Sequence, residues 1–478
     1  MWRILAAREL AEHWRDRRFV FSLGVCVAVA VAFAVLELPE WSRRQQAAGQ
    51  DEVRRKEYVR DALADGFGTW GVQFLPLPAA RTPSRLSPFA AGVEAAMDEI
   101  FTVTGFGLST SKPDLKRRLF GYYGETVRLD VVLLVGTLFG LFALVFGSMG
   151  VTAERETGTL PLVLAQGASR RSVFFSKYLG LLAHSAVLLA ALFLLLGLGA
   201  LTGGLRFSAG EILTLGVLLA VSVLYLSSCV LLGLCISVVA RTTQAAVTWA
   251  LIAWVGLVLV GPTAAMSAGA ALAEPPRSWV YRAEWRTKAD EIDAGVRRKM
   301  GMLLPSLPPG TARRTNAAHE GTNVNTVPPA AQVIVDAAVE EGDMASALFA
   351  AMERTRLKQN QTAALWGRPF PVASYSSLAA SLTGTGAAHQ ERLAESVAGY
   401  AREWRDYLRE VRALPRPAGA SYEEIAVNPD RLPHFRRPQP DVASACLLAW
   451  PDLLVLVLWN AALAIAGVQA FCRRDVIG

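Results

Sequence analysis

The side chains most able to do chemistry are spread along the chain and form no catalytic motif. The phosphate-binding pattern G-x-x-x-x-G-K-[ST] and the nucleophile pattern G-x-S-x-G are both missing from the sequence. His319-Glu320 begins like the zinc motif H-E-x-x-H, but no second histidine follows at the required helical spacing. The histidines are isolated from one another: His13, His184, His319, His389 and His434. We therefore expect no enzyme activity, catalytic residue, metal site or cofactor in this chain, and no ATP hydrolysis by the chain alone.

One short charged segment, residues 151–178, has residue types suited to binding another protein. It starts with Glu154-Arg155-Glu156 and continues through a glycine, a proline and an apolar patch. Ser169 is a suitable N-cap for the helix that follows, because its hydroxyl can accept from a free N–H of the first turn. The residues alone leave two interpretations open: a hairpin that merely connects two helices, or a docking element for a partner.

Composition and hydropathy indicate the elements that must position this segment. Of 478 residues, 53% are hydrophobic and 19% are charged, and the mean hydropathy is +0.32. A helix of about 20 apolar residues spans a bilayer. The runs of this length are 19–38, 131–150, 179–201, 212–240, 245–266 and 443–471. We therefore predict an all-α polytopic membrane protein with six transmembrane helices, the first of them too long for a cleavable signal peptide.

Basic residues predict the orientation of the spans. They gather before the first span, in residues 151–178, at Arg241 and in the C-terminal tail. With six spans these segments all lie on one side, whereas the short loop on the other side has only Arg206. Because cytoplasmic loops are enriched in lysine and arginine, we expect both termini and residues 151–178 to be cytoplasmic.

The net charge of +7 is compatible with nucleic acid or with a membrane. The arginines lie largely next to apolar runs and form no aromatic-interleaved basic face, which favours the membrane and argues against nucleic acid. The five cysteines lie in or beside the spans, so no disulfide is expected to staple the segments outside them.

Two long polar segments, 39–128 and 267–442, are predicted to be mainly helical extracytoplasmic insertions. The first contains a short predicted helix over 89–100. The second contains apolar residues three and four positions apart between Leu393 and Val411, which is typical of an amphipathic helix. This stripe either packs against neighbouring helices or forms a docking face, and the pattern does not decide between them.

Residues 151–178 contain the motif E-R-E-x-G-T-L, followed by A-S-R-R and K-Y. In these motifs the segment resembles the loop between the second and third spans of ABC-2 type transporter permeases. In that family this loop forms the coupling helix, which sits in a groove of the ATPase subunit. The resemblance implies an ATPase-coupling role for Glu154, Arg155, Glu156, Gly158, Thr159, Leu160, Ser169, Arg170 and Lys177. The amphipathic residues 1–18 are similar to the interfacial helix that precedes the first span in these permeases, and they also suit a simple basic anchor.

Two further stretches are similar to one branch of that family, which has large insertions after spans one and five and is related to gliding-motility-type permeases. One is ASYSSLAASLTGTGAAHQERLAESVAGYAREWRDYLR, in which Gly-Thr-Gly separates two helices. The other is the closing LVLWNAALAIAGVQAFCRRDV. The resemblance covers nearly the whole chain, although residues 267–330 have no residue-level match.

The resemblance implies a permease subunit of an ABC-2 type transporter, with export as the expected direction, in a bacterial inner membrane. It implies as partners a separate cytoplasmic ATPase that holds ATP and Mg, a second permease subunit, identical or not, and the lipid bilayer. The alternative is a mechanotransmitting subunit whose outer domains act on an extracytoplasmic partner protein. A third hypothesis, a membrane-anchored enzyme or receptor without an ATPase, predicts that residues 154–164 tolerate substitution.

Overall fold

The computed structural model describes most of the chain as helix. The described residues are 17–64, 77–80, 84–92, 100–104, 107–108, 130–167, 169–202, 206–273, 278–303, 328–413, 431, 433, 435 and 442–473. The elements in the half that holds the spans are α2 (Arg17–Ala64), α5 (Val131–Leu134), η2 (Val135–Phe139), α6 (Gly140–Met149), α7 (Thr152–Glu156), α8 (Thr159–Ala165), α9 (Arg170–Thr202), α10 (Ala209–Val239), α11 (Thr243–Trp254), η3 (Val255–Val260), α12 (Gly261–Leu272) and α18 (Val442–Arg473). The elements of the two insertions are β1 (Leu77–Ala80), β2 (Ile100–Thr104), β3 (Gly107–Leu108), α13 (Ser278–Leu303), α15 (Pro328–Gly367), α16 (Pro371–Leu382) and α17 (Ala387–Ala413).

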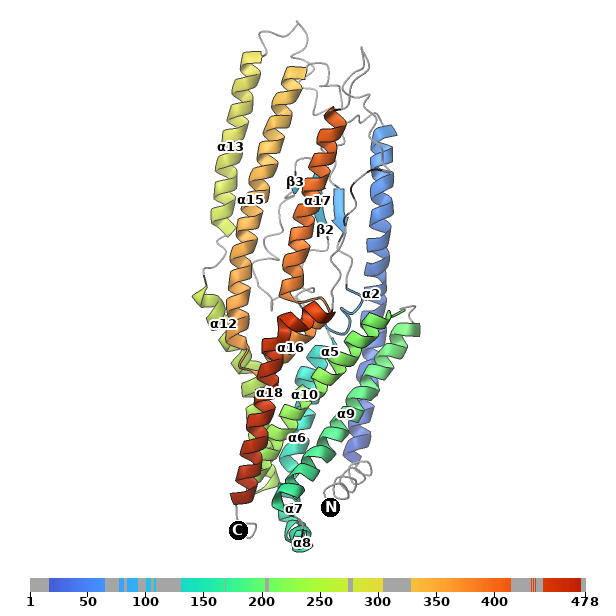
Figure 1. Cartoon of the computed structure of the whole chain (residues 1–478), viewed down its shortest axis with the longest axis vertical. Helices are drawn as coiled ribbons and strands as arrows, with labels where there is room; N and C mark the ends of the chain where they lie inside the picture. Colours follow the sequence, from blue (N-terminus) through green and yellow to red (C-terminus); the bar gives the residue numbers. More distant parts are fainter. Residues whose placement is uncertain are drawn as a thin grey trace.

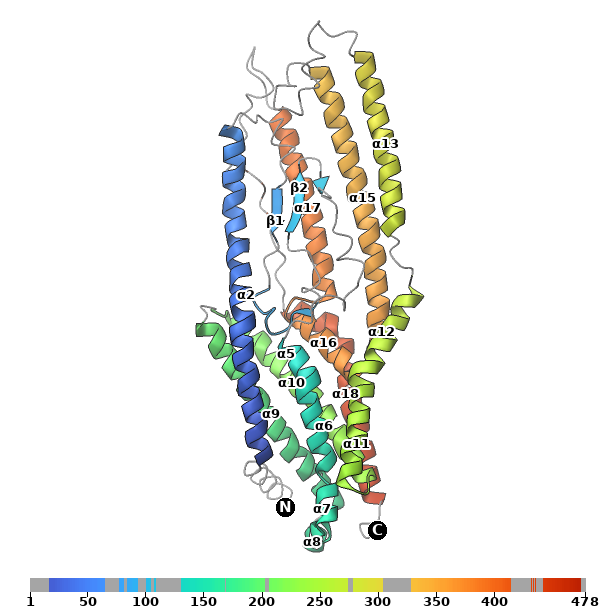
Figure 2. The ribbon, with the colours of Figure 1, turned by 180° about the vertical axis from the view of Figure 1, so that it is seen from behind.

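Six helices among the described residues are long and apolar enough to cross a membrane. They are Val20–Arg43, Val131–Glu156, Arg170–Thr202, Ala209–Val239, Thr243–Leu272 and Ala449–Arg473. The predicted fold class, an all-α polytopic membrane protein, is confirmed. The span helices form the lower bundle in Figure 1, and the insertion helices α13, α15 and α17 stand above it beside the upper half of α2. We call the end of the bundle with α7 and α8 the loop end; α2 begins and α18 ends there too, as the view from behind also shows (Figure 2).

Helix α10 forms the centre of the bundle, where it packs against α6, α9, α11, α16 and α18. It approaches α6 so closely that a Cβ on Gly147 would lie 2.7 Å from the carbonyl oxygen of Val230. Small residues permit such close packing between helices in a membrane. Tyr178 of α9 and Ser227 of α10 add a hydrogen bond of 2.7 Å between their hydroxyl oxygens. The bundle is therefore held by close backbone packing together with polar contacts between spans.

The first insertion contributes a small sheet that the sequence analysis did not predict. Strands β1, β2 and β3 pair antiparallel in that order, with Leu77 opposite Val103 and Val103 opposite Leu108. The helix predicted over 89–100 is wrong in its described part, because Phe89 ends a turn that starts at Arg85, Ala90 and Ala91 have no regular structure, and Ile100 begins β2. The residues of β2 (IFTVT) include β-branched side chains that favour extended backbone.

Helix α16 joins the second insertion to the spans by packing against α5, α10 and α18. The ring of Tyr375 stacks on Tyr225 of α10 with 4.8 Å between centroids, and its hydroxyl lies 2.8 Å from that of Ser222. Next to it, buried Asp452 of α18 accepts from Arg368 Nε at 2.9 Å, an ion pair near the start of α16. A displacement of α10 or α18 would therefore also displace α16.

The break predicted at Gly-Thr-Gly separates α16 from α17. Gly384 has φ +70°, a left-handed conformation in which glycine is favoured. The hydroxyl of Thr385 donates to the carbonyl of Ala90 at 2.9 Å, and the hydroxyl of Ser84 donates to the carbonyl of Thr383 at 2.8 Å. The two insertions are thus fastened to each other above the spans.

Helix α17 resolves one alternative that the sequence left open. The described part of its apolar stripe from Leu393 to Trp404 is buried: Leu393, Val397, Tyr400 and Trp404 are each at most 3% exposed. The stripe packs against the other insertion elements, including α15 and β3. The packing interpretation is therefore confirmed for residues 393–404, which are no free docking face.

Other predictions fall largely outside the described residues. These are the interfacial helix 1–18, apart from its last two residues, most of the first insertion between 65 and 129, and most of the return segment 414–441. His13, His319 and His434 also lie outside them.

Candidate functional site

The loop between the second and third spans folds into two short helices, α7 and α8. A residue in the left-handed backbone conformation joins them. Helix α7 ends at Glu156, and Gly158 takes φ +69° before α8 begins. The hydroxyl of Thr159 reaches back to the carbonyl of Glu154 at 3.3 Å and lies 3.0 Å from the hydroxyl of Thr157. A Cβ on Gly158 would meet nothing within 4 Å, so glycine serves the backbone turn there and not the packing.

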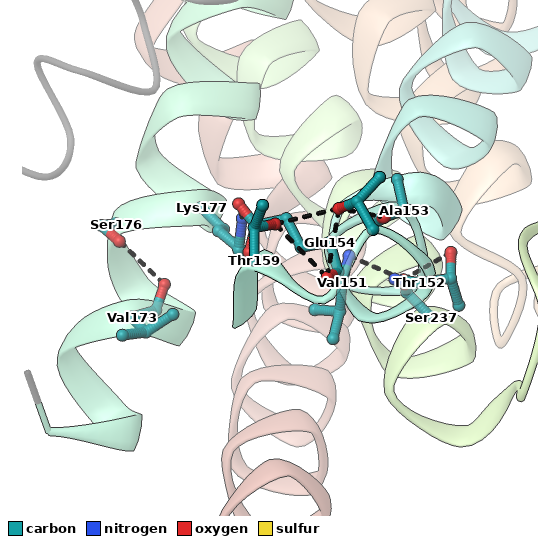
Figure 3. A network of polar contacts seen from close by, with 10 residues as sticks. Val151, Thr152, Ala153, Glu154, Thr159, Val173, Ser176, Lys177 and Ser237 are labelled. Atoms are coloured by element: carbon teal, nitrogen blue, oxygen red, sulfur yellow. Dashed lines mark hydrogen bonds and ion pairs between the residues drawn. The ribbon is translucent and has the colours of Figure 1, made fainter. Parts of the chain in front are cut away.

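Glu154 ties this loop to α9. Its carboxylate lies 2.6 Å from the ammonium of Lys177, whose side chain is only 4% exposed. Figure 3 shows the pair between the two elements. Burying an ammonium is costly unless an opposite charge compensates it, so Glu154 and Lys177 require each other.

Arg155 ties the loop to the end of α10. Its guanidinium donates to the carbonyl of Ala240 at 2.7 Å and to that of Val238 at 3.4 Å. The last carbonyls of a helix have no partner within the helix and carry its negative dipole end. Arg155 therefore caps α10 from a residue 85 positions away in the sequence.

Glu156 and Ser237 complete a set of reciprocal caps. The carboxylate of Glu156 accepts from the backbone N–H and the hydroxyl of Thr243, both at 2.7 Å, at the start of α11. The hydroxyl of Ser237, near the end of α10, accepts from the N–H groups of Val151 and Thr152 at 2.9 and 3.0 Å. Helix α7 has no side-chain cap from its own Ncap residue, so α10 supplies one (Figure 3).

The start of α9 extends these contacts to the last span. Ser169 caps α9 by accepting from the N–H of Ser172 at 3.2 Å, as predicted. Arg170 donates to the carbonyl of Cys472 at 3.0 Å, near the end of α18. We call the set of residues that joins these helix ends the end clamp: Glu154, Arg155, Glu156, Arg170, Lys177 and Ser237.

Five exposed residues of the loop form what we call the loop tip: Thr157, Gly158, Thr159, Pro161 and Leu162. Leu162 is 64% exposed although it is apolar, whereas Leu160 is 1% exposed and anchors α8 to the bundle. The loop thus divides into an internal part that joins the spans and an exposed part.

The predicted site residues fall on both sides of this division. Leu160, Ser169 and the charged members make contacts within the chain, whereas Gly158 and Thr159 belong to the loop tip. Ser237 and Thr243 were not predicted as cap partners, because no local pattern marks a cap between distant helices. Leu162 was not among the predicted site residues, because only the fold shows its exposure.

Among the residues that the structure describes, no three histidine, cysteine or acidic side chains lie close enough to hold a metal ion. The described arrangement at the loop end consists of caps and the ion pair between Glu154 and Lys177. Its capacity is mechanical: it can pass a displacement of the loop tip to several spans.

Comparisons with known proteins agree with the resemblance seen in the sequence. A family model described as "ABC-2 family transporter protein" matches residues 3–364, which is most of the chain. A second model, a domain of unknown function (DUF3526), matches residues 311–425, within the second insertion. No curated protein matches the chain.

Proposed function

Because the chain belongs to the ABC-2 transporter family, we propose that it is the permease subunit of an ATP-driven exporter in a bacterial inner membrane. Permeases of this family are multi-pass membrane subunits that work with an ABC ATPase. In our proposal the loop end is cytoplasmic, ATP and Mg are held by the ATPase, and a second permease subunit completes the transporter. The chain itself contributes no catalytic group.

The observation that carries this proposal is the division of the loop into end clamp and loop tip. The end clamp connects α7 to α9, α10 and α11, and through Arg170 it connects α9 to α18. A closing ATPase that pushes on the loop tip would therefore move these helix ends together. A hairpin that merely connects two spans would not need charged side chains that bind the ends of other helices.

Photo-crosslinking from the loop tip tests this proposal. A photoreactive residue would replace Leu162, and a matched control would replace Leu194 of α9, which is likewise 64% exposed. We expect crosslinks to the co-expressed ATPase from position 162 and none from position 194, which faces lipid in the third span. Equal labelling from both positions, or none from 162, would contradict the proposed coupling role.

A second candidate function is favoured by two continuous connections between the spans and the insertions. Helix α2 runs without interruption from Arg17 to Ala64, or about 70 Å at 1.5 Å per residue, more than twice the bilayer core. Helix α16 bonds to α10 and α18 as described. Both would carry motion of the spans to the outer domains, which could then act on an extracytoplasmic partner protein without passing a substrate between the spans.

A further inference from the structure

Helices α13 and α15, which we call the outer pair, stand at one edge of the insertions (Figures 1 and 2). The outer pair is fixed to the fifth span at its base. Gln359 of α15 donates to the carbonyl of Ala270 at 3.1 Å, and a Cβ on Gly269 would lie 3.0 Å from the carbonyl oxygen of Thr362. Helix α13 packs mainly against α15, and most of its described residues are exposed. Helix α13 therefore has free surface outside the membrane.

A groove of about 580 Å³ lies between the two helices of the outer pair. Its floor is apolar and includes Ile292 and Val296 of α13 and Met344 and Leu348 of α15. These four side chains are partly exposed. Two helices side by side leave such a floor half covered, whereas a four-helix bundle encloses it. Exposed charged residues of both signs line the rim of the groove: Glu284, Lys288, Glu291, Lys299 and Glu340.

Two of these rim charges, Lys299 and Glu340, belong to different helices. The hydroxyls of Tyr281 and Thr355 lie 3.3 Å apart and fix the register of the outer pair. Counted from this contact along antiparallel helices, Lys299 and Glu340 lie within about one turn of each other in height. None of the ion pairs found within the described part of the chain includes either residue. A partner with a glutamate and a lysine at this height would therefore match both.

We propose that a second copy of this chain docks on the groove, so that the two outer pairs form a four-helix bundle outside the membrane. This inference rests on the proposed function, which includes a second permease subunit. Two copies inserted in one membrane share their orientation, so a two-fold axis along the membrane normal relates them. Such an axis keeps each residue at its own height and sets α13 of one copy antiparallel to α15 of the other. Lys299 of each copy then faces Glu340 of the other, and the two apolar floors close on each other.

A small amphipathic molecule is the competing occupant, because its usual binding sites have volumes in this range. Two features favour the second copy. The rim carries lysine and glutamate together, which an identical rim complements, whereas a ligand of one charge would meet both signs. The outer pair also stands at the edge of the insertions, where a second copy in the same membrane can reach it (Figure 1).

Single cysteines on α13 test the inference on the full complex in membranes. Gly295 lines the groove and Gly301 lies outside its lining, and a Cβ at either position would meet nothing within 4 Å. A short bismaleimide should therefore join two copies through Gly295→Cys and not through Gly301→Cys. The natural chain, with its five cysteines, gives the background.

Equal products from the two positions, or none from Gly295→Cys, would overturn the docking of a second copy. A product that joins position 295 to an unlike subunit would also overturn it, and would assign the groove to that subunit. Each of these results would leave intact the coupling role that crosslinking from Leu162 tests. Failure at Leu162 would overturn the proposed function, whatever the result at position 295.

Charge swaps in two differently tagged copies test the contact between Lys299 and Glu340. Lys299→Glu gives one copy two negative groups at this height, and Glu340→Lys gives the other copy two positive groups. The mixed pair of copies then sets opposite charges against each other, whereas two identical copies set like charges against each other. We expect the mixed pair to co-purify about tenfold better than either like pair.

The same swap at the exposed Arg297 and Glu341, which do not line the groove, is the matched control. Arg297→Glu and Glu341→Arg should give no preference for the mixed pair. Within each variant copy of the first swap the two groups keep the same sign, so a contact inside one chain cannot produce the preference. Equal co-purification of mixed and like pairs in that swap would overturn the inference.

Discussion

At the scale of residues, the charged side chains of the loop act as partners for helix ends and for one another. Each of Glu154, Arg155 and Glu156 contacts a different helix. Two of them satisfy backbone groups that a helix leaves free at its ends. These side chains thus connect the spans, although their spacing alone also suits a surface that binds a partner.

The pair between Glu154 and Lys177 predicts a non-additive mutant series. Lys177→Met leaves a half-buried carboxylate without its cation and should destabilise the protein by about 3 kcal/mol. Adding Glu154→Gln to Lys177→Met removes that unpaired charge and should recover part of the loss. Apparent melting temperatures in detergent would measure the stability of the single and the double variant. A double variant that is less stable than Lys177→Met alone would contradict the interpretation.

Asp130 gives a prediction about pH. It caps α5 and accepts from the backbone N–H groups of Leu133 and Ala91 at 2.6 and 2.8 Å. Burial raises the pKa of Asp130 to about 6, although these hydrogen bonds oppose the shift. The unfolded value is about 4. The contribution of Asp130 to stability is therefore full below about pH 4 and is lost as the pH rises through about 6.

This loss should be on the order of 2–3 kcal/mol, at about 1.4 kcal/mol per pKa unit. Melting temperatures between pH 4 and 7 would show it as a slope. Asp130→Asn should flatten the slope, whereas Asp290→Asn, at an exposed position on α13, should leave it unchanged. A slope that persists in Asp130→Asn would assign the pH dependence to other groups.

At the scale of elements, α10 contacts the loop, four other spans and the insertion helix α16. Its packing on α6 depends on the absence of side chains at Gly147 and Gly233. The central position of α10 makes it the element through which the loop end and the insertions are connected.

Two glycines of α10 give a matched pair of substitutions. A Cβ on Gly233 would collide with the carbonyl oxygen of Leu144, whereas one on Gly216 would meet nothing within 4 Å. Gly233→Ala should therefore cost about 2–3 kcal/mol by forcing α6 and α10 apart. Gly216→Ala should be neutral or slightly stabilising, because alanine favours helix. Thermal unfolding in detergent compares them, and equal effects would refute the close contact.

At the scale of the whole molecule, the spans and the insertions form one connected body. Contacts at α16 join them from inside, and α2 joins them along one side (Figure 1). A movement that begins at the loop end can therefore reach the insertions without a flexible linker. This continuity is the feature that the mechanotransmitting alternative requires.

Removing the α16 contact should interrupt that transmission. Tyr375→Ala deletes the stack on Tyr225, worth about 1 kcal/mol beyond burial, and the contact with Ser222. With labels at the exposed Glu57 and Glu340, pulsed EPR on the ATPase complex should show a nucleotide-dependent change in distance for the natural chain and a smaller one for Tyr375→Ala. Tyr375→Phe, which keeps the stack, should retain most of the change. An undiminished change in Tyr375→Ala would show that α16 does not carry the motion.

The six spans, the Ser169 cap and the break at Gly384 could be predicted from the sequence, because hydrophobic runs, caps and left-handed glycines are properties of neighbouring residues. The roles of Ser237, Arg155 and Glu156 could not, because each contacts a backbone group more than 80 positions away. The same limit applies to the strands, whose partners come from separate stretches of the first insertion. A helix end reveals in its own sequence that it needs a partner, but only the packing of the helices decides which side chain arrives there.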